Sequence, residues 1–164
     1  MNKTRILSLL SIYLALGVLV SPIFYVDLGF AKVFPMQHLL NVCLAVWFGT
    51  RYNLMGAFAL SSLRILLGLG TIMAYPGSLF GAVLAAYFYE KTQSLWMASL
   101  GEVIGTGLIG SLVAYGIASY VLGSTLGAMA FVLPFVLSSL TGALLAQVIL
   151  RYGQKLFPKL KDGQ

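Results

Sequence analysis

The chain has 164 residues, of which 60% are hydrophobic and only 9% are charged. A soluble domain usually carries about 25% charged residues because its surface must be hydrated. Four acids and ten bases are therefore too few to cover a water-soluble protein of this size, and lipid is the expected solvent for most of the surface. The length suits a single membrane domain over residues 1–164 and leaves no room for a separate nucleotide-binding or catalytic domain.

The net charge of +6 does not indicate nucleic-acid binding, because the bases separate apolar runs instead of clustering on a polar face. Cys43 is the only cysteine and lies inside an apolar run, so we interpret it as a small buried residue. Lys3 and Arg5 precede an apolar run as in a signal peptide, but no small-residue cleavage site follows it. We therefore expect that run to be retained as the first membrane span.

Apolar runs separated by turn residues predict an all-α integral membrane protein with six transmembrane helices. Pro35 opens the second run, where its missing N–H costs nothing, and the residues 49–51 form the turn after it. The expected helices cover residues 6–21, 35–48, 52–67, 77–89, 95–122 and 126–151.

Two of these helices, at residues 35–48 and 77–89, are shorter than the roughly 20 residues that cross a bilayer core. They border two irregular segments, at residues 24–34 and 68–78. Irregular backbone at membrane depth is tolerated only where protein or a water-filled cavity covers it. We therefore expect a cavity beside these two segments.

The bases predict which side of the membrane each segment faces. With six alternating spans, only Lys32 and Arg64 fall toward one side. The other eight bases share the opposite side, and they are Lys3, Arg5, Arg51, Lys91, Arg151, Lys155, Lys159 and Lys161. Cytoplasmic loops carry the excess of Lys and Arg. Both termini are therefore predicted to be cytoplasmic, and the cavity is predicted to open to the outside.

Arg64 and Glu102 are the charged candidates inside the expected spans, and such residues normally face the protein interior or a cavity. Their depths differ by roughly 8 Å at 1.5 Å per residue, which two long side chains can bridge. Arg64 is thus either a ligand contact, a partner of Glu102, or a side chain extended toward the outer surface. Thr106 lies four residues after Glu102 and shares its polar face, whereas Gly101 and Gly105 indicate close helix packing.

Polar side chains also open the second helix. His38 and Asn41 are three residues apart, so they share a helix face, and Gln37 adjoins them. At the start of the fourth helix, Ser78 either caps the helix or contacts a polar ligand, and Tyr75 adds an aromatic ring. One histidine and one cysteine give no metal-ligand spacing, and no Ser-His-Asp grouping is present. No metal, cofactor or catalytic residue is expected.

Four stretches carry a family resemblance: PMQHLLNV, SSLRILLGLGT, AYPGSLFGA and LGEVIGTGLIG. They resemble the ThiW family in the expected order and cover most of the chain. This family is assigned to the substrate-binding S components of energy-coupling factor (ECF) vitamin transporters. The resemblance implies an ECF S-component fold that binds a vitamin or precursor from outside the cell membrane of a prokaryote. It also implies a transmembrane coupling protein and two cytoplasmic ATPases as partners, and hydroxyethylthiazole, the thiazole part of thiamine, as substrate.

The expected substrate-binding residues are Gln37, His38, Asn41, Arg64, Tyr75, Ser78, Glu102 and Thr106. An ion pair between Arg64 and Glu102 would leave the cavity neutral, which suits an uncharged thiazole, and Tyr75 or Phe34 would stack on its ring. Many S components carry an A-x-x-x-A docking pattern in the first helix, where this chain has Ser11 and Ala15.

Three alternatives to a thiazole carrier remain. The first is an S component for another precursor, such as hydroxymethylpyrimidine, or for thiamine itself. The second is a small intramembrane enzyme, although such enzymes usually bring clustered acids or a nucleophile with its base. The third is a structural protein without a small ligand, which the polar face of Gln37, His38 and Asn41 does not favour.

Overall fold

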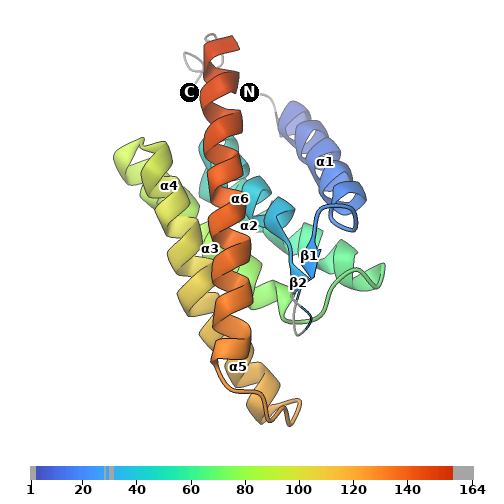
Figure 1. Ribbon diagram of the computed structural model, residues 1–164. Helices are drawn as coiled ribbons and strands as arrows, with labels where there is room; N and C mark the ends of the chain where they lie inside the picture. Colours follow the sequence, from blue (N-terminus) through green and yellow to red (C-terminus); the bar gives the residue numbers. More distant parts are fainter. Residues whose placement is uncertain (1–2, 28, 30–31, 157–164) are drawn as a thin grey trace.

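The computed structural model describes residues 3–27, 29 and 32–156, the last three of them by their backbone only. Helices dominate, and a small hairpin of two strands joins the first two of them (Figure 1). In chain order the elements are α1 (Lys3–Val20), β1 (Val26–Asp27), β2 (Lys32–Val33), α2 (Pro35–Leu66), α3 (Ala74–Thr92), α4 (Leu95–Glu102), the π-helix η1 (Val103–Gly110), α5 (Ser111–Tyr120) and α6 (Met129–Leu156).

Helix α2 is a helical hairpin, because Gly49 interrupts it with a φ of 72° and a ψ of −177°. Glycine adopts this conformation without the steric strain that a side chain would add. The two arms, residues 35–48 and 50–66, run back along each other, so that Gln37 bonds to Ser61 across the hairpin. The Glu90 carboxylate accepts hydrogen bonds from the backbone N–H of Thr50 (2.8 Å) and from its hydroxyl (2.9 Å), which caps the second arm.

Helices α4, η1 and α5 follow one another without a break and pack against α3. Glycines make this contact possible, since a Cβ added at Gly101 or Gly105 would strike the backbone of α3. The close-packing role expected for these two glycines is thereby confirmed. Cys43 is a free thiol with no exposed surface, and it lies in the apolar core that α2 forms with α4 and α6. It is thus buried as expected.

Three helical stretches of the described residues are long and apolar enough to cross a membrane. They are Lys3–Val20, Leu95–Tyr120 and Met129–Gly153. Helix α3 and the two arms of α2 do not meet that criterion, so six spans remain a prediction. The first turn of α1 and the last described turn of α6 lie at the same end of the molecule (Figure 1). Which side of a membrane this end faces also remains a prediction, and the side chains of Lys155, Lys159 and Lys161 lie outside the described part.

The two segments expected to be irregular have more structure than the sequence suggested. Residues 24–34 contain the antiparallel pair β1 and β2, in which Val26 lies opposite Val33. Helix α3 starts at Ala74, three residues earlier than expected, so that Pro76 lies in its first turn. The first N–H groups of a helix have no partner within it, and proline therefore loses nothing there.

Candidate functional site

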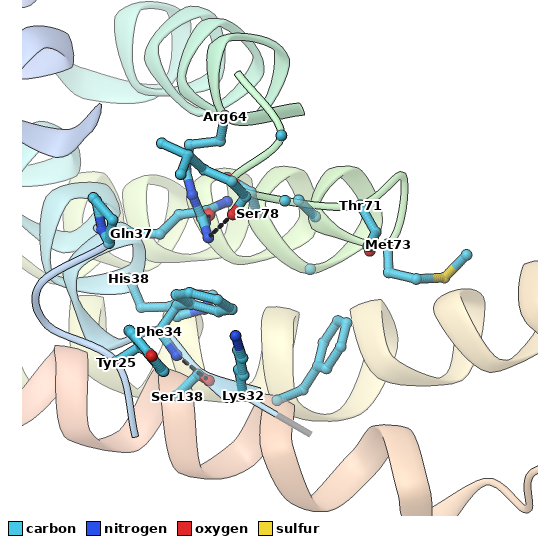
Figure 2. Close-up of a pocket in the computed structure, with 17 residues that line it drawn as sticks. Tyr25, Lys32, Phe34, Gln37, His38, Arg64, Thr71, Met73, Ser78 and Ser138 are labelled. Atoms are coloured by element: carbon cyan, nitrogen blue, oxygen red, sulfur yellow. Dashed lines mark hydrogen bonds between the residues drawn. The ribbon is translucent and has the colours of Figure 1, made fainter. Parts of the chain in front are cut away.

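A cavity of about 660 Å³ lies beside the β1–β2 hairpin that follows the last turn of α1. Its walls come from the β1–β2 hairpin, both arms of α2, the loop of residues 67–73, the start of α3 and the first half of α6 (Figure 2). Helices α4 and α5 and the π-helix contribute no lining residue, although the site was expected to reach the fifth helix. The volume falls within the range of roughly 300–1,000 Å³ that small-molecule sites occupy.

Arg64 is held rigidly in the wall of this cavity by three neighbours (Figure 2). Its guanidinium donates hydrogen bonds to Oε1 of Gln37 and to the backbone oxygen of Leu69 (3.1 Å). The same group lies over the ring of Phe34, with 4.4 Å between the guanidinium carbon and the ring centroid. Gln37 is fixed in turn by a 3.1 Å bond to the hydroxyl of Ser61. This arrangement presents a fixed positive charge to the cavity.

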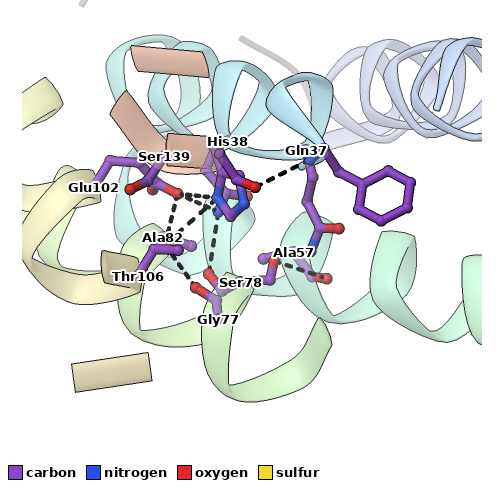
Figure 3. A network of polar contacts seen from close by, with 12 residues as sticks. Gln37, His38, Ala57, Gly77, Ser78, Ala82, Glu102, Thr106 and Ser139 are labelled. Atoms are coloured by element: carbon purple, nitrogen blue, oxygen red, sulfur yellow. Dashed lines mark hydrogen bonds and ion pairs between the residues drawn. The ribbon is translucent and has the colours of Figure 1, made fainter. Parts of the chain in front are cut away.

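His38 lies beside Gln37 and connects the cavity to a buried polar network (Figure 3). Its Nδ1 lies 2.8 Å from Oε1 of Glu102, whose side chain has no exposed surface. No hydrogen bond engages the other ring nitrogen, Nε2, among the described residues. Since the carboxylate fixes the ring through Nδ1, Nε2 is the atom of His38 that can serve a ligand.

Asn41 and Thr106 complete the network behind His38. The Asn41 amide donates to Glu102 Oε1 (3.1 Å) and to the backbone oxygen of Ser78 (3.1 Å). The Thr106 hydroxyl lies 2.7 Å from the backbone oxygen of Gly77 and 3.0 Å from Glu102 Oε1. Three helical segments, α2, α3 and the α4–η1 junction, are thereby joined around one carboxylate oxygen.

The structure places the expected substrate-binding residues in three groups. Gln37, His38, Arg64 and Ser78 line the cavity. Asn41, Glu102 and Thr106 lie behind its wall in the buried network. Tyr75 lies apart from both, stacked on Phe58 with ring centroids 5.5 Å apart and bonded to the hydroxyl of Ser62 (2.9 Å). Ser11 and Ala15 lie on the exposed face of α1.

The structure does not contain two of the interactions that the sequence left open. Arg64 does not pair with Glu102. Glu102 contacts His38, and the guanidinium of Arg64 donates hydrogen bonds to Gln37 and to the backbone of Leu69. A depth difference of roughly 8 Å had made the pair possible, but in the structure each of the two side chains has other partners. Ser78 does not cap a helix either, because α3 begins at Ala74, and its hydroxyl instead contacts the backbone oxygen of Ala57 (3.5 Å).

Several lining residues were not predicted, among them Tyr25, Lys32, Phe135 and Ser138. Ser138 Oγ accepts a 3.0 Å bond from the N–H of Phe34, which ties the start of α2 to α6. The hydroxyl proton of Ser138 remains available to a ligand. The aromatic and basic residues between 25 and 34 were a usable signal, since the segment was expected to cover a cavity.

Rigid aromatic rings, a fixed cation and several hydrogen-bonding groups thus surround a space of small-molecule size. The apolar helices around it indicate a membrane protein, and the cavity is its candidate site for a small ligand. The sequence matches the family described as thiamine-precursor transporter protein (ThiW) over residues 7–156. The chain belongs to this ThiW family. Among curated proteins, none matches the chain closely enough to count as a relative.

Proposed function

We propose that this protein captures a thiamine precursor outside the cell membrane as the S component of an ECF transporter, with hydroxyethylthiazole as its substrate. The cavity beside the β1–β2 hairpin is the single observation that carries the proposal. Membership of a transporter family argues for transport and against the enzyme alternative. In the proposed orientation the cavity opens outward, and the bases of the opposite end face the cytoplasm.

The lining offers each contact that a hydroxyethyl thiazole requires. Phe34 and Tyr25 supply aromatic faces on which the five-membered ring stacks. The hydroxyl of Ser138 donates to the ring nitrogen, and Nε2 of His38 exchanges a hydrogen bond with the hydroxyethyl group. Glu102 acts as a positioning residue in this scheme, because it fixes the His38 ring from behind.

The transport step requires partners. We propose that a transmembrane coupling protein docks on the exposed face of α1 around Ser11 and Ala15, and that two cytoplasmic ATPases drive substrate release. Small residues on a lipid-facing helix allow another helix to approach closely. Copurification from its native membrane tests this part of the proposal. An ATPase module that copurifies with wild type and is lost from Ala15→Leu supports it, whereas an equal yield of the module with both proteins contradicts the docking face.

Calorimetric titration of the purified protein tests the ligand. Hydroxyethylthiazole, hydroxymethylpyrimidine and thiamine are titrated separately into wild type and into His38→Ala. We expect hydroxyethylthiazole to bind most tightly and the variant to bind it at least tenfold more weakly. Tighter binding of hydroxymethylpyrimidine or thiamine would replace the substrate within the same function. No binding of any of the three by folded protein would refute the proposed function.

A further inference from the structure

The described side chains that line the cavity include bases but no acids. Arg64 and Lys32 both line it, and none of its described lining residues is an aspartate or glutamate. Lys32 extends from β2, and its ammonium nitrogen lies 4.8 Å from the centroid of the Tyr25 ring (Figure 2). Two cations and no acid among the described lining residues give the cavity a positive potential.

Arg64 is the more informative of the two cations, because only 2% of its surface is exposed. Its contacts are a neutral amide, a backbone carbonyl and an aromatic ring, and its Nε has no hydrogen-bond partner. No described carboxylate lies within ion-pair distance of it. A buried charge without a counter-ion is costly. The cost is recovered when an anionic ligand group supplies the counter-ion.

Glu102 does not fill this role, since its Oε1 is occupied by His38, Asn41 and Thr106. A protonated His38 cancels the charge of Glu102, and the cavity then keeps both cations. A neutral His38 leaves one negative charge behind the wall against two positive charges in the lining. The site is therefore positive in either protonation state of His38.

Lys32 also has no acidic partner among the described residues, although Asp27 lies opposite it in the hairpin. The Asp27 carboxylate accepts a 2.8 Å hydrogen bond from the N–H of Gly29, and no ion pair joins it to Lys32. Lys32 is exposed at the cavity while Arg64 is buried in its wall. An anion in the cavity would therefore contact the flexible side chain of Lys32 and the fixed planar guanidinium of Arg64.

We propose that the ligand of this cavity carries an anionic group, a phosphate or a carboxylate, which binds at Arg64 and Lys32. The inference rests on the proposed function and refines its substrate from the neutral hydroxyethylthiazole to an anionic derivative of the same thiazole. The monophosphate ester of hydroxyethylthiazole, or the thiazole with a carboxymethyl group in place of hydroxyethyl, then binds more tightly than the neutral alcohol. Thiamine, whose thiazolium is a cation, is repelled.

Calorimetry in nanodiscs tests this with four ligands: hydroxyethylthiazole, its monophosphate, the thiazole-acetic acid and thiamine. We expect at least one of the two anions to bind tenfold or more tightly than the alcohol, and thiamine to bind most weakly. Raising the salt concentration should weaken the binding of the anions and leave the affinity for the alcohol unchanged. The two anions distinguish a phosphate from a carboxylate as the preferred group.

Variants locate the effect. Arg64→Gln should reduce anion affinity about 30-fold, as expected for a charged hydrogen bond. Lys32→Gln should reduce the anion affinity about three- to fivefold, because Lys32 is exposed. This variant still tests the proposal if Arg64→Gln does not fold. Lys91→Gln is the matched control, since Lys91 is another exposed lysine over a tyrosine ring (5.8 Å from Tyr87) but lies outside the cavity.

The outcomes separate the two proposals. If the alcohol binds as tightly as both anions, or if Lys32→Gln and Lys91→Gln behave alike, the anionic ligand is refuted while the thiazole function stands. Thiamine binding as tightly as the alcohol would equally refute the positive-cavity inference. If none of the four ligands binds to folded protein, the proposed function fails as well.

Discussion

Replacing Glu102 by leucine removes the centre of the buried network, and the structure sets how much stability is lost. Asn41 keeps the backbone oxygen of Ser78 at 3.1 Å, and Thr106 keeps that of Gly77 at 2.7 Å. Only Nδ1 of His38 loses its main acceptor. One unsatisfied buried donor costs about 1–3 kcal/mol, so we expect Glu102→Leu to lower the free energy of unfolding by that amount. If all three donors were orphaned, the loss would be about three times larger.

Glu102→Gln is the matched control for this prediction. Its amide oxygen can occupy the position of Oε1, and its NH₂ group that of Oε2, which has no partner among the described residues. The acceptor for His38 is retained without the charge, and the unpaired NH₂ group only replaces an oxygen that is already unpaired, so we expect a loss below about 1 kcal/mol. Unfolding by sodium dodecyl sulfate in mixed micelles, followed by far-ultraviolet circular dichroism, measures both variants.

A double-mutant cycle with His38→Ala tests the pairing itself. Residues in direct contact usually show coupling energies of about 0.5–3 kcal/mol, whereas independent sites add within about 0.3–0.5 kcal/mol. We expect coupling in the first range between His38 and Glu102. Additive effects, or a Glu102→Gln variant as unstable as Glu102→Leu, would refute the claim that the network fixes the His38 ring in the cavity wall.

Two further predictions concern packing and capping. A methyl group at Gly81 would lie 2.6 Å from Glu102 Oε1, so Gly81→Ala should destabilise the protein by about 1–3 kcal/mol in the same micelle assay. A methyl group at Gly116 would meet open space within a helix, so Gly116→Ala should be neutral or stabilising by up to about 1 kcal/mol. Equal effects of Gly81→Ala and Gly116→Ala on stability would contradict the close packing at Gly81. Glu90→Ala removes the cap at Thr50 and should cost about 1 kcal/mol, and an unchanged unfolding midpoint would argue against the cap.

The sequence predicted the features that depend on local composition. A reversal of the chain near Gly49 follows from a glycine between two apolar runs, and the structure has it at that residue. The burial of Cys43 follows from its apolar neighbours. The cavity beside residues 24–34 and 68–78 was expected because irregular backbone needs cover at membrane depth, and both segments contribute to its walls.

Pairing between helices could not be predicted in the same way. Position along a helix gives the depth of a side chain, but it does not give the direction in which the helix is rotated within the bundle. The depths of Arg64 and Glu102 therefore allowed them to pair, whereas in the structure Glu102 pairs with His38. The two-residue strand that carries Lys32 is too short for an alternating pattern, so the sequence indicated that this segment borders a cavity but not that Lys32 lines it.

Growth of a bacterium that requires external thiazole tests the central claim most directly. The strain carries the ATPase module and either wild type or the double variant His38→Ala, Arg64→Ala, and it grows on limiting hydroxyethylthiazole. Protein level in the membrane is measured for both. We predict growth with wild type and none with the double variant. Equal growth with the double variant would contradict the site, and no growth with correctly inserted wild type would contradict capture of this precursor.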